Sequence, residues 1–190
     1  MNDSTPNLVD LARLVQRIDD RQQLTELLSR YGTAVDDRDF DTLGALFAED
    51  GEFRGVKGRQ AVIDFYRLRT GDYSASTHHA VTCHFDFDSD DSARGVVNGE
   101  AELCIGGKTI RIVLRYLDTY TRTPGHWVFQ QRVVLFRYVL PFDAVADGLA
   151  DPMRVRWPGT QPRAADLPDT LATFIANRGT KAAAPVAKPS

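Results

Sequence analysis

The sequence predicts an α+β fold in which helices come first and an antiparallel β-sheet follows. Before residue 71, apolar residues recur at helical spacing. After residue 71, four segments are rich in β-branched and aromatic residues and are separated by turn signals: 75–88, 93–105, 108–121 and 126–140. Their connections are too short for a crossover helix, so the strands must pair antiparallel and the helices must pack on one face of the sheet.

Four helices are expected before the long strands. The first begins at Thr5-Pro6, and a capping sequence at Asp19/Asp20 predicts that a second, longer helix begins there. The acidic break at 36–39 ends this helix, and two shorter helices follow around a first strand at 52–56. Apolar positions identify the faces that the first two helices bury: Leu8, Leu11, Val15 and Ile18, then Leu24, Leu27, Leu28, Tyr31 and Val35.

The pattern changes again after the last strand. Five prolines between 141 and 168, with little periodicity, predict that residues 142–179 form an extended arm with a short helix within 167–179. We expect residues 1–7 to be flexible and residues 180–190 to be disordered. The folded domain is therefore expected over residues 8–141.

Composition excludes several classes of protein. The chain has 190 residues, of which 43% are hydrophobic and 26% charged, as is typical of one globular domain with some extra length. A net charge of −3 gives no reason to expect a nucleic-acid partner. No apolar run reaches the roughly 18 residues of a membrane span, so no membrane partner is expected. The polar, acidic start lacks the features of a signal peptide, which predicts a cytoplasmic protein.

Three of the four histidines lie in one predicted strand. His78 and His84 share a face but are about 20 Å apart, too far for one metal ion whose bonds to nitrogen are about 2 Å. His79 points to the other face, with Val81, Cys83, Phe85 and Phe87. That set is apolar and must face the interior, so His79 is expected to be buried. A register shift of one residue would turn every side chain over and bring His78 inside instead.

Two longer stretches resemble a known family. "YGTAVDDRDFDTLGALFAEDGEF" (31–53) and "RYLDTYTRTPGHWVFQQRVV" (115–134) are similar to the SnoaL-like branch of the nuclear transport factor 2-like superfamily, over about residues 10–140. The resemblance implies a cone-shaped, strongly curved antiparallel sheet wrapped around the N-terminal helices. It also implies an apolar pocket inside the sheet and assembly into homodimers or homotrimers.

The resemblance also implies a catalytic site. Its matching positions are Tyr31 and Asp36 on the long helix and His79 on the sheet, with His78 as the substitute if the register shifts. Histidine suits proton abstraction beside a carbonyl, a carboxylate orients its ring, and a tyrosine hydroxyl stabilises the developing oxyanion. Residues 31 and 36 are about 140° apart around a helix, so both reach one pocket only if the helix ends near Val35. The alternatives are a core role for Tyr31 and a helix-end charge for Asp36.

We therefore predict a cofactor-free, metal-free lyase, most concretely a dehydratase acting on a mid-sized apolar ring compound such as a steroid, terpenoid or polyketide. One alternative is an isomerase of the ketosteroid isomerase or cyclase kind that uses the same pocket. The other is a noncatalytic ligand-binding protein resembling the small subunit of a ring-hydroxylating dioxygenase. Further pocket residues are expected from the same helices and strands: Tyr66, His78, Trp127 and Tyr138, with Arg132 as another candidate. The arm either closes over the pocket or packs on a neighbouring subunit.

Overall fold

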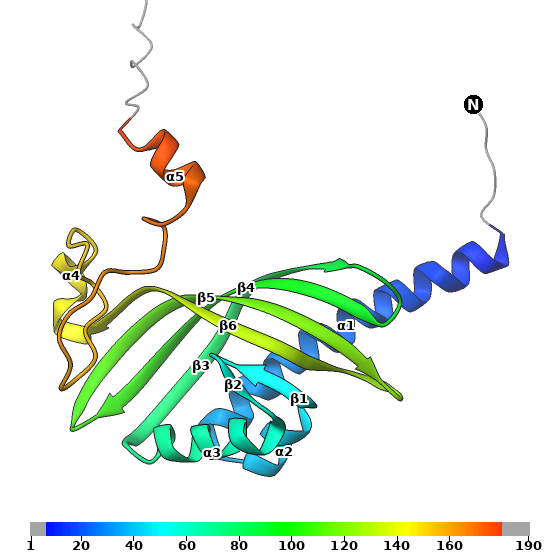
Figure 1. Cartoon of the computed structure of the whole chain (residues 1–190), viewed down its shortest axis with the longest axis horizontal. Helices are drawn as coiled ribbons and strands as arrows, with labels where there is room; N and C mark the ends of the chain where they lie inside the picture. The colour runs from blue at the N-terminus through cyan, green and yellow to red at the C-terminus, as the bar shows by residue number, and fades with distance from the viewer. Residues whose placement is uncertain (1–6, 180–190) are drawn as a thin grey trace, which may run out of the picture.

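The computed structural model describes residues 7–179 (Figure 1). The N-terminal helices lie against one side of a curved, unclosed sheet of six strands in the order β2-β1-β6-β5-β4-β3. The predicted α+β class and the curved sheet around N-terminal helices are confirmed. The predicted disordered tail at 180–190 lies outside the described residues, as does the expected flexible segment 1–7 apart from Asn7.

The four long strands match the predicted segments closely. They are β3 (Tyr73–Phe87), β4 (Ser92–Ile105), β5 (Lys108–Thr123) and β6 (His126–Pro141), and each pairs antiparallel with the next. The short strands β1 (Phe47–Phe53) and β2 (Val56–Lys57) form a hairpin at the other edge. Because β1 runs parallel to β6, the sheet is mixed and not wholly antiparallel.

Helix α1 (Leu8–Asp36) is a single helix of 29 residues, so the predicted break at Asp19/Asp20 is wrong. The side chain of Asp20 does not cap a new helix. It is buried and accepts hydrogen bonds from the guanidinium of Arg122 and from Nε1 of Trp127, the latter at 3.2 Å. The carboxylate binds side chains of the sheet and does not cap a helix, so α1 continues through this position. The true start is capped by Asn7, whose side chain accepts from the amides of Val9 and Asp10.

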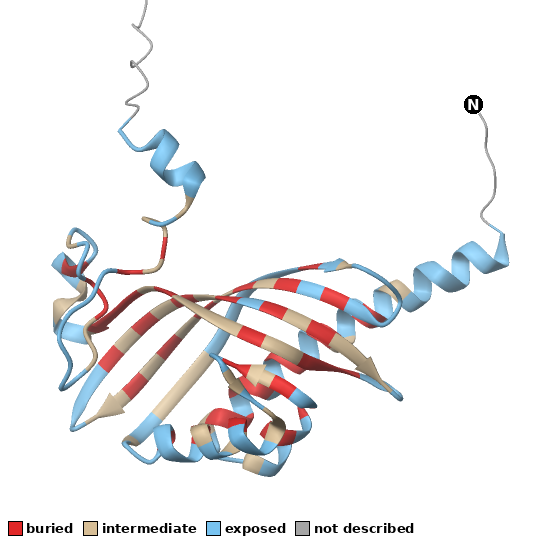
Figure 2. Ribbon diagram, viewed as in Figure 1, coloured by how far each residue is buried: buried red, intermediate tan, exposed pale blue. Residues whose placement is uncertain are grey.

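Only the second half of α1 belongs to the core. Its apolar side chains from Leu24 to Val35 are buried against the sheet, whereas the first half extends beyond the sheet into solvent (Figure 2). The apolar face predicted for that first half is exposed: Leu8 84%, Leu11 48%, Val15 58% and Ile18 63%. Two shorter helices, α2 (Phe40–Ala45) and α3 (Arg59–Thr70), complete the helical layer, and α3 buries Val62 and Tyr66.

The arm packs on the chain's own sheet. It contains a short 3-10 turn η1 (Phe142–Ala144) and the helices α4 (Val145–Gly148) and α5 (Ala172–Asn177). The amide of Val139 on β6 donates to the carbonyl of Arg154 at 2.9 Å, and the amide of Arg156 donates back to Val139 at 2.8 Å. This pairing carries the next residue, Trp157, to the open end of the sheet. Among the described residues, no helix has both the length and the apolar character to span a membrane. The cytoplasmic location stays a prediction.

Candidate active site

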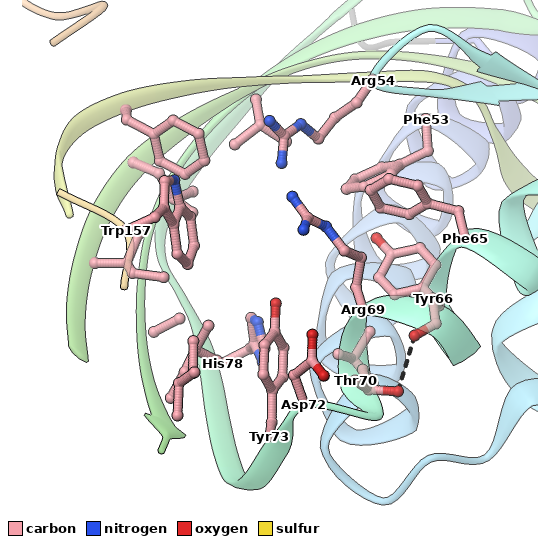
Figure 3. A pocket seen from close by; sticks show the side chains of 18 of the residues that line it. Phe53, Arg54, Phe65, Tyr66, Arg69, Thr70, Asp72, Tyr73, His78 and Trp157 are labelled. Carbon is pink, nitrogen blue, oxygen red and sulfur yellow. Dashed lines mark hydrogen bonds between the residues drawn. The ribbon is translucent and has the colours of Figure 1, made fainter. Parts of the chain in front are cut away.

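A cavity of about 230 Å³ lies between the inner face of the sheet, helices α1 and α3, and the arm (Figure 3). Eight aromatic side chains contribute to its wall: Tyr31, Phe53, Phe65, Tyr66, Tyr73, Tyr116, Phe136 and Trp157. Aliphatic side chains of β4 and β5 complete it. The polar groups that reach it are few, and they include His78. This is the composition typical of small-molecule sites, in which a largely apolar wall carries a few placed polar groups.

His78 forms a hydrogen-bonded pair with Asp36 at the wall of this cavity. Nδ1 of His78 lies 2.6 Å from Oδ1 of Asp36, and the backbone amide of His78 donates to Oδ2 at 2.7 Å. The hydroxyl of Ser76 donates to Oδ1 at 2.8 Å. Both members of the pair are largely shielded, with side chains 16% and 19% exposed. Asp36 itself does not line the cavity, so it acts on a ligand only through the ring of His78.

A β-bulge decides which histidine faces inward. On β4 the odd-numbered residues 93–103 face the interior, and their partners on β3 are Phe87, Phe85, Cys83, Ala80, His78 and Ser76. The pairing shifts between Ala80 and Thr82, which makes Val81 the extra residue. The bulge reverses the alternation upstream of it, so the expected burial of His79 is wrong. His79 is exposed, and its Nε2 lies 3.0 Å from the hydroxyl of Thr77 on the outer side.

Helix α1 reaches the strand because of Gly32. A Cβ at this position would lie 2.9 Å from the carbonyl oxygen of His78, closer than real Cβ atoms approach. Asp36 follows one helical turn later, on the same face of the helix. The helix ends at Asp36, close to the predicted end, and Tyr31 is placed beside the cavity while Asp36 is placed behind the imidazole. The close approach at Gly32 thus sets the distance across which the pair forms.

The hydrogen bonds fix the charge and tautomer of the pair. Burial acts to raise the pKa of Asp36, but the hydrogen bonds from the ring of His78, the hydroxyl of Ser76 and the backbone outweigh it and hold that pKa below its usual value. A carboxylate only accepts hydrogen bonds, so the proton of neutral His78 must sit on Nδ1. Nε2 is then the nitrogen with the free lone pair, as a general base requires.

Tyr31 lies in a cluster of hydroxyls. Its Oη is 2.6 Å from Oη of Tyr66, and Tyr66 also lines the cavity, as predicted from the sequence. Burial raises the pKa of Tyr66 and of Tyr116 well above the usual value for tyrosine, with the neighbouring Tyr31 adding to the effect. Both therefore keep their protons and remain able to donate. When Tyr66 donates to Tyr31, the proton of Tyr31 is left for a ligand.

Arg132 does not line this cavity but lies behind Tyr31. Its guanidinium is fully buried and pairs with Asp118 through hydrogen bonds of 2.9 and 2.8 Å. The guanidinium carbon lies 4.2 Å from the ring centre of Tyr31 and 4.0 Å from that of Tyr116. Burial opposes the charge, but Asp118 outweighs burial and holds the pKa of Arg132 well above its usual value. The charged guanidinium therefore makes cation–π contacts with the rings of Tyr31 and Tyr116 and holds them in position.

Two residues predicted to line the pocket are placed elsewhere. Trp127 is buried at the far end of the sheet, where it bonds Asp20 and packs edge-on against Phe87. Tyr138 lies on the outer face, opposite Val113, because a second bulge at Arg137 reverses the alternation of β6 after Phe136. Both predictions are wrong, because the contact of Trp127 with the middle of α1 and the bulge in β6 are not visible in the pattern of single strands.

The sequence reasoning missed other polar groups. Ser76 has no signal of its own, because its role comes from lying two residues before His78 on the same face. Arg54 and Arg69 line the cavity from a turn and from an exposed side of α3, where charged residues are ordinary. Within residues 7–179, no group of three or more histidine, cysteine, aspartate or glutamate side chains is arranged to hold a metal ion.

Comparisons with known proteins agree with this architecture. A model of the SnoaL-like domain family matches residues 16–133. A putative scytalone dehydratase from Novosphingobium aromaticivorans is 19% identical with a TM-score of 0.66, covering 80% of this chain and 95% of that one. The hexachlorocyclohexane dehydrochlorinase LinA-type3 from Novosphingobium barchaimii is 22% identical with a TM-score of 0.64, covering 69% and 95%.

An NTF2-like protein with a cystatin-like fold, also from N. aromaticivorans, is 26% identical with a TM-score of 0.57, covering 69% of this chain and 90% of that one. No curated protein sequence matches the chain significantly. The likeness to the solved structures establishes the fold that positions the cavity.

Proposed function

The chain belongs to the SnoaL-like domain family, and on that premise we propose that it is a cofactor-free lyase of the dehydratase kind. The observation that carries the proposal is the hydrogen-bonded pair of His78 and Asp36 at the wall of an aromatic cavity. Two structural neighbours carry names of elimination enzymes, a dehydrochlorinase and a putative dehydratase. The catalytic histidine proposed is His78, in place of His79.

The proposed reaction is loss of water from a β-hydroxy carbonyl compound. Nε2 of His78 removes the proton on the carbon beside the carbonyl, and Asp36 stabilises the imidazolium that forms. Tyr31 donates a hydrogen bond to the carbonyl oxygen as negative charge develops there. The electron pair of the broken C–H bond forms the C=C bond, and the C–O bond to the β-hydroxyl breaks. His78 returns its proton to the departing hydroxide, which leaves as water.

The size of the cavity narrows the substrate. Its volume of about 230 Å³ is below the usual range for drug-sized ligands, about 300–1,000 Å³. It therefore favours one or two rings inside the cavity over a complete four-ring steroid. Terpenoid or polyketide rings of that size suit the aromatic wall, with any larger part of the molecule outside the mouth.

Proton abstraction can be tested without the natural substrate. The protein is incubated in deuterium oxide with a panel of cyclic β-hydroxy ketones, and mass spectrometry follows both deuterium uptake beside the carbonyl and loss of water. We expect His78→Gln and Asp36→Asn to lose both activities, while His79→Gln, the matched control on the outer face, keeps them. Full activity of His78→Gln would refute the proposed base.

The same experiment separates the alternatives. An isomerase of the ketosteroid isomerase or cyclase kind shares the abstraction step, so it gives deuterium uptake and a moved double bond without loss of water. A noncatalytic ligand-binding protein, like a dioxygenase small subunit, binds the ketones but incorporates no deuterium. Elimination is favoured here because His78 is the one histidine lining the cavity among residues 7–179 and can serve as both base and acid.

We also propose that the protein forms a homodimer or homotrimer through a second copy at the exposed half of α1. The exposed residues Leu8, Leu11, Val15 and Ile18 follow the three-four-three spacing of a coiled-coil seam. A monomer with this apolar stripe in water is unfavourable. Light scattering after size-exclusion chromatography should show that Leu11→Glu with Val15→Glu lowers the oligomer mass to that of one chain, whereas Arg13→Glu on the opposite side does not.

The arm is proposed as part of the active-site wall and not as an independent element. Trp157, Pro158 and Thr160 line the cavity, and Trp157 packs edge-on against Phe136 at 5.8 Å. Replacing Trp157 by alanine should lower turnover of a ring substrate while the far-UV spectrum stays unchanged. Unchanged turnover would show that the arm does not close the cavity.

A further inference from the structure

Two arginines that have no role in the proposed elimination face the cavity. Arg54, from the turn between β1 and β2, and Arg69, from α3, both line the cavity. Figure 3 shows their guanidinium groups directed into the open space, with Arg54 across that space from His78. Both residues are exposed at the mouth of the cavity, but their charges are directed toward the same space, where like charges repel each other.

Neither arginine has a counter-ion among residues 7–179. Among the residues that the structure describes, no carboxylate lies within 4.0 Å of either guanidinium, and neither side chain makes a hydrogen bond. Each stacks over a ring, Arg54 on Phe136 at 5.4 Å and Arg69 on Phe65 at 5.8 Å. Arg67 on the same helix shows the ordinary outcome, since it pairs with Asp64 at 3.6 Å. Of the described residues, Asp72 is the one carboxylate that lines the cavity, and it forms no ion pair with either arginine. The mouth therefore keeps an excess of positive charge.

The backbone holds Arg54 in place at a cost. Arg54 has φ +51° and Gly55 has φ +86°, so both central residues of this two-residue hairpin turn are left-handed. Such turns favour Asn-Gly, and an arginine at the first position is unusual. Partial burial lowers the pKa of Arg54, and the nearby positive charge of Arg69 lowers it further. An anion between them would relieve both effects.

We propose that Arg54 and Arg69 bind a carboxylate group of the substrate, so that the substrate is a ring compound with an acidic substituent remote from the reacting carbon. The two guanidinium groups offer the planar donors that recognise a carboxylate. A carboxylate held at the mouth places the attached ring between the aromatic walls and directs its far side toward His78. The inference rests on the proposed function only in taking this cavity as the substrate site.

Binding tests this inference independently of turnover. Isothermal titration calorimetry compares naphthoate with the uncharged naphthamide on the full chain. We expect naphthoate to bind at least about tenfold more tightly, because a hydrogen bond to a charged group is worth about 1.5 kcal/mol or more, which is about tenfold in affinity. Arg54→Asn, which also suits the left-handed turn, and Arg69→Gln should each remove most of that preference. Arg67→Gln, whose arginine is already paired, should keep it.

The outcomes separate this inference from the proposed reaction. Equal affinity for the two probes, or a preference that survives in the double variant Arg54→Asn with Arg69→Gln, would overturn the carboxylate site. If naphthoate is preferred through the two arginines but no deuterium enters the cyclic ketones, the carboxylate site stands and the proposed elimination fails. In His78→Gln the preference for naphthoate should persist, since that residue faces the other end of the cavity.

Discussion

The close contact at Gly32 gives the sharpest prediction about how the helix and the sheet make one site. Alanine at this position would place Cβ 2.9 Å from the carbonyl oxygen of His78, where an ordinary contact begins at 3.4 Å. The helix and the strand must therefore separate by about 0.5 Å, because a backbone carbonyl cannot rotate away as a side-chain end can. The bond from Nδ1 of His78 to Asp36, now 2.6 Å, would lengthen toward about 3.1 Å, beyond the range of a good charge-assisted bond.

The expected magnitudes follow from that separation. Overpacking costs about 1–3 kcal/mol of stability, while alanine returns about 1 kcal/mol of helix propensity. We therefore expect Gly32→Ala to lower the free energy of unfolding by about 0–2 kcal/mol. Catalysis should suffer more, by about tenfold, since a displacement of about 1 Å costs about 100-fold in rate.

Deuterium exchange and proton NMR provide the assay. We expect the short bond to Asp36 to shift the Nδ1 proton of His78 far downfield, and this signal should move upfield in Gly32→Ala as exchange activity falls. Gly44→Ala is the matched control, because its Cβ would meet the flexible end of Ile63 at 2.6 Å, far from the pair. A downfield signal and an exchange rate that are unchanged in Gly32→Ala would refute the reasoning, and an equal loss in Gly44→Ala would assign the effect to general destabilisation.

Three further predictions concern charge and register. The hydrogen bonds from His78, Ser76 and the backbone hold the pKa of Asp36 in the fold below its unfolded value, so the ionised form favours the fold. This stabilisation is fully present above the unfolded pKa of about 3.9 and is lost as the pH falls through the lower folded value. Asp36→Asn should therefore make the thermal midpoint less dependent on pH in that acidic range, and an unchanged pH dependence would contradict this. Asp118→Asn should cost about 3–5 kcal/mol in urea unfolding by leaving the charge of Arg132 buried without its carboxylate, whereas the double change Asp118→Leu with Arg132→Met should recover most of it. His79→Ala should leave the unfolding temperature and the deuterium exchange rate unchanged, because the ring of His79 is exposed on the outer face of the sheet. A loss of activity would show that this outer face contributes to the reaction.

The sequence predicted most of the sheet because its signals there are local. Turn residues at 89–92, 106–107 and 123–125 separate long alternating segments, and the four strands fall within a few residues of the expected bounds. The continuity of α1 was not predictable in this way. The sequence around Asp20 resembles a helix start, and only the hydrogen bonds of Asp20 with Arg122 and Trp127 show that its carboxylate binds the sheet instead.

The candidate site was predictable only in part, because some of its residues depend on contacts between distant segments. Tyr31 and Asp36 were identified from a family resemblance; Asp36 is hydrogen-bonded to the imidazole of His78, and Tyr31 lines the cavity that this imidazole faces. Whether His78 or His79 faces inward depends on the bulge at Val81. Val81 is a good strand former, and only the pairing of β3 with β4, which follows later in the chain, shows that it is the extra residue. The two cavity arginines were missed because nothing in a turn or on an exposed helix side marks a charge that will lack a partner.

The two adjacent histidines on β3 have a consequence for how such a wall tolerates change. Because Val81 is the extra residue, its deletion would leave the other pairs of β3 with β4 unchanged, and His78 would still face inward opposite Ala101. If the bulge straightened with Val81 kept, the strand would slip by one residue, and His79 would face inward opposite Ala101 instead. The inner wall thus keeps an imidazole opposite the same residue of β4 whether the bulge is lost by a deletion or by a slip of register.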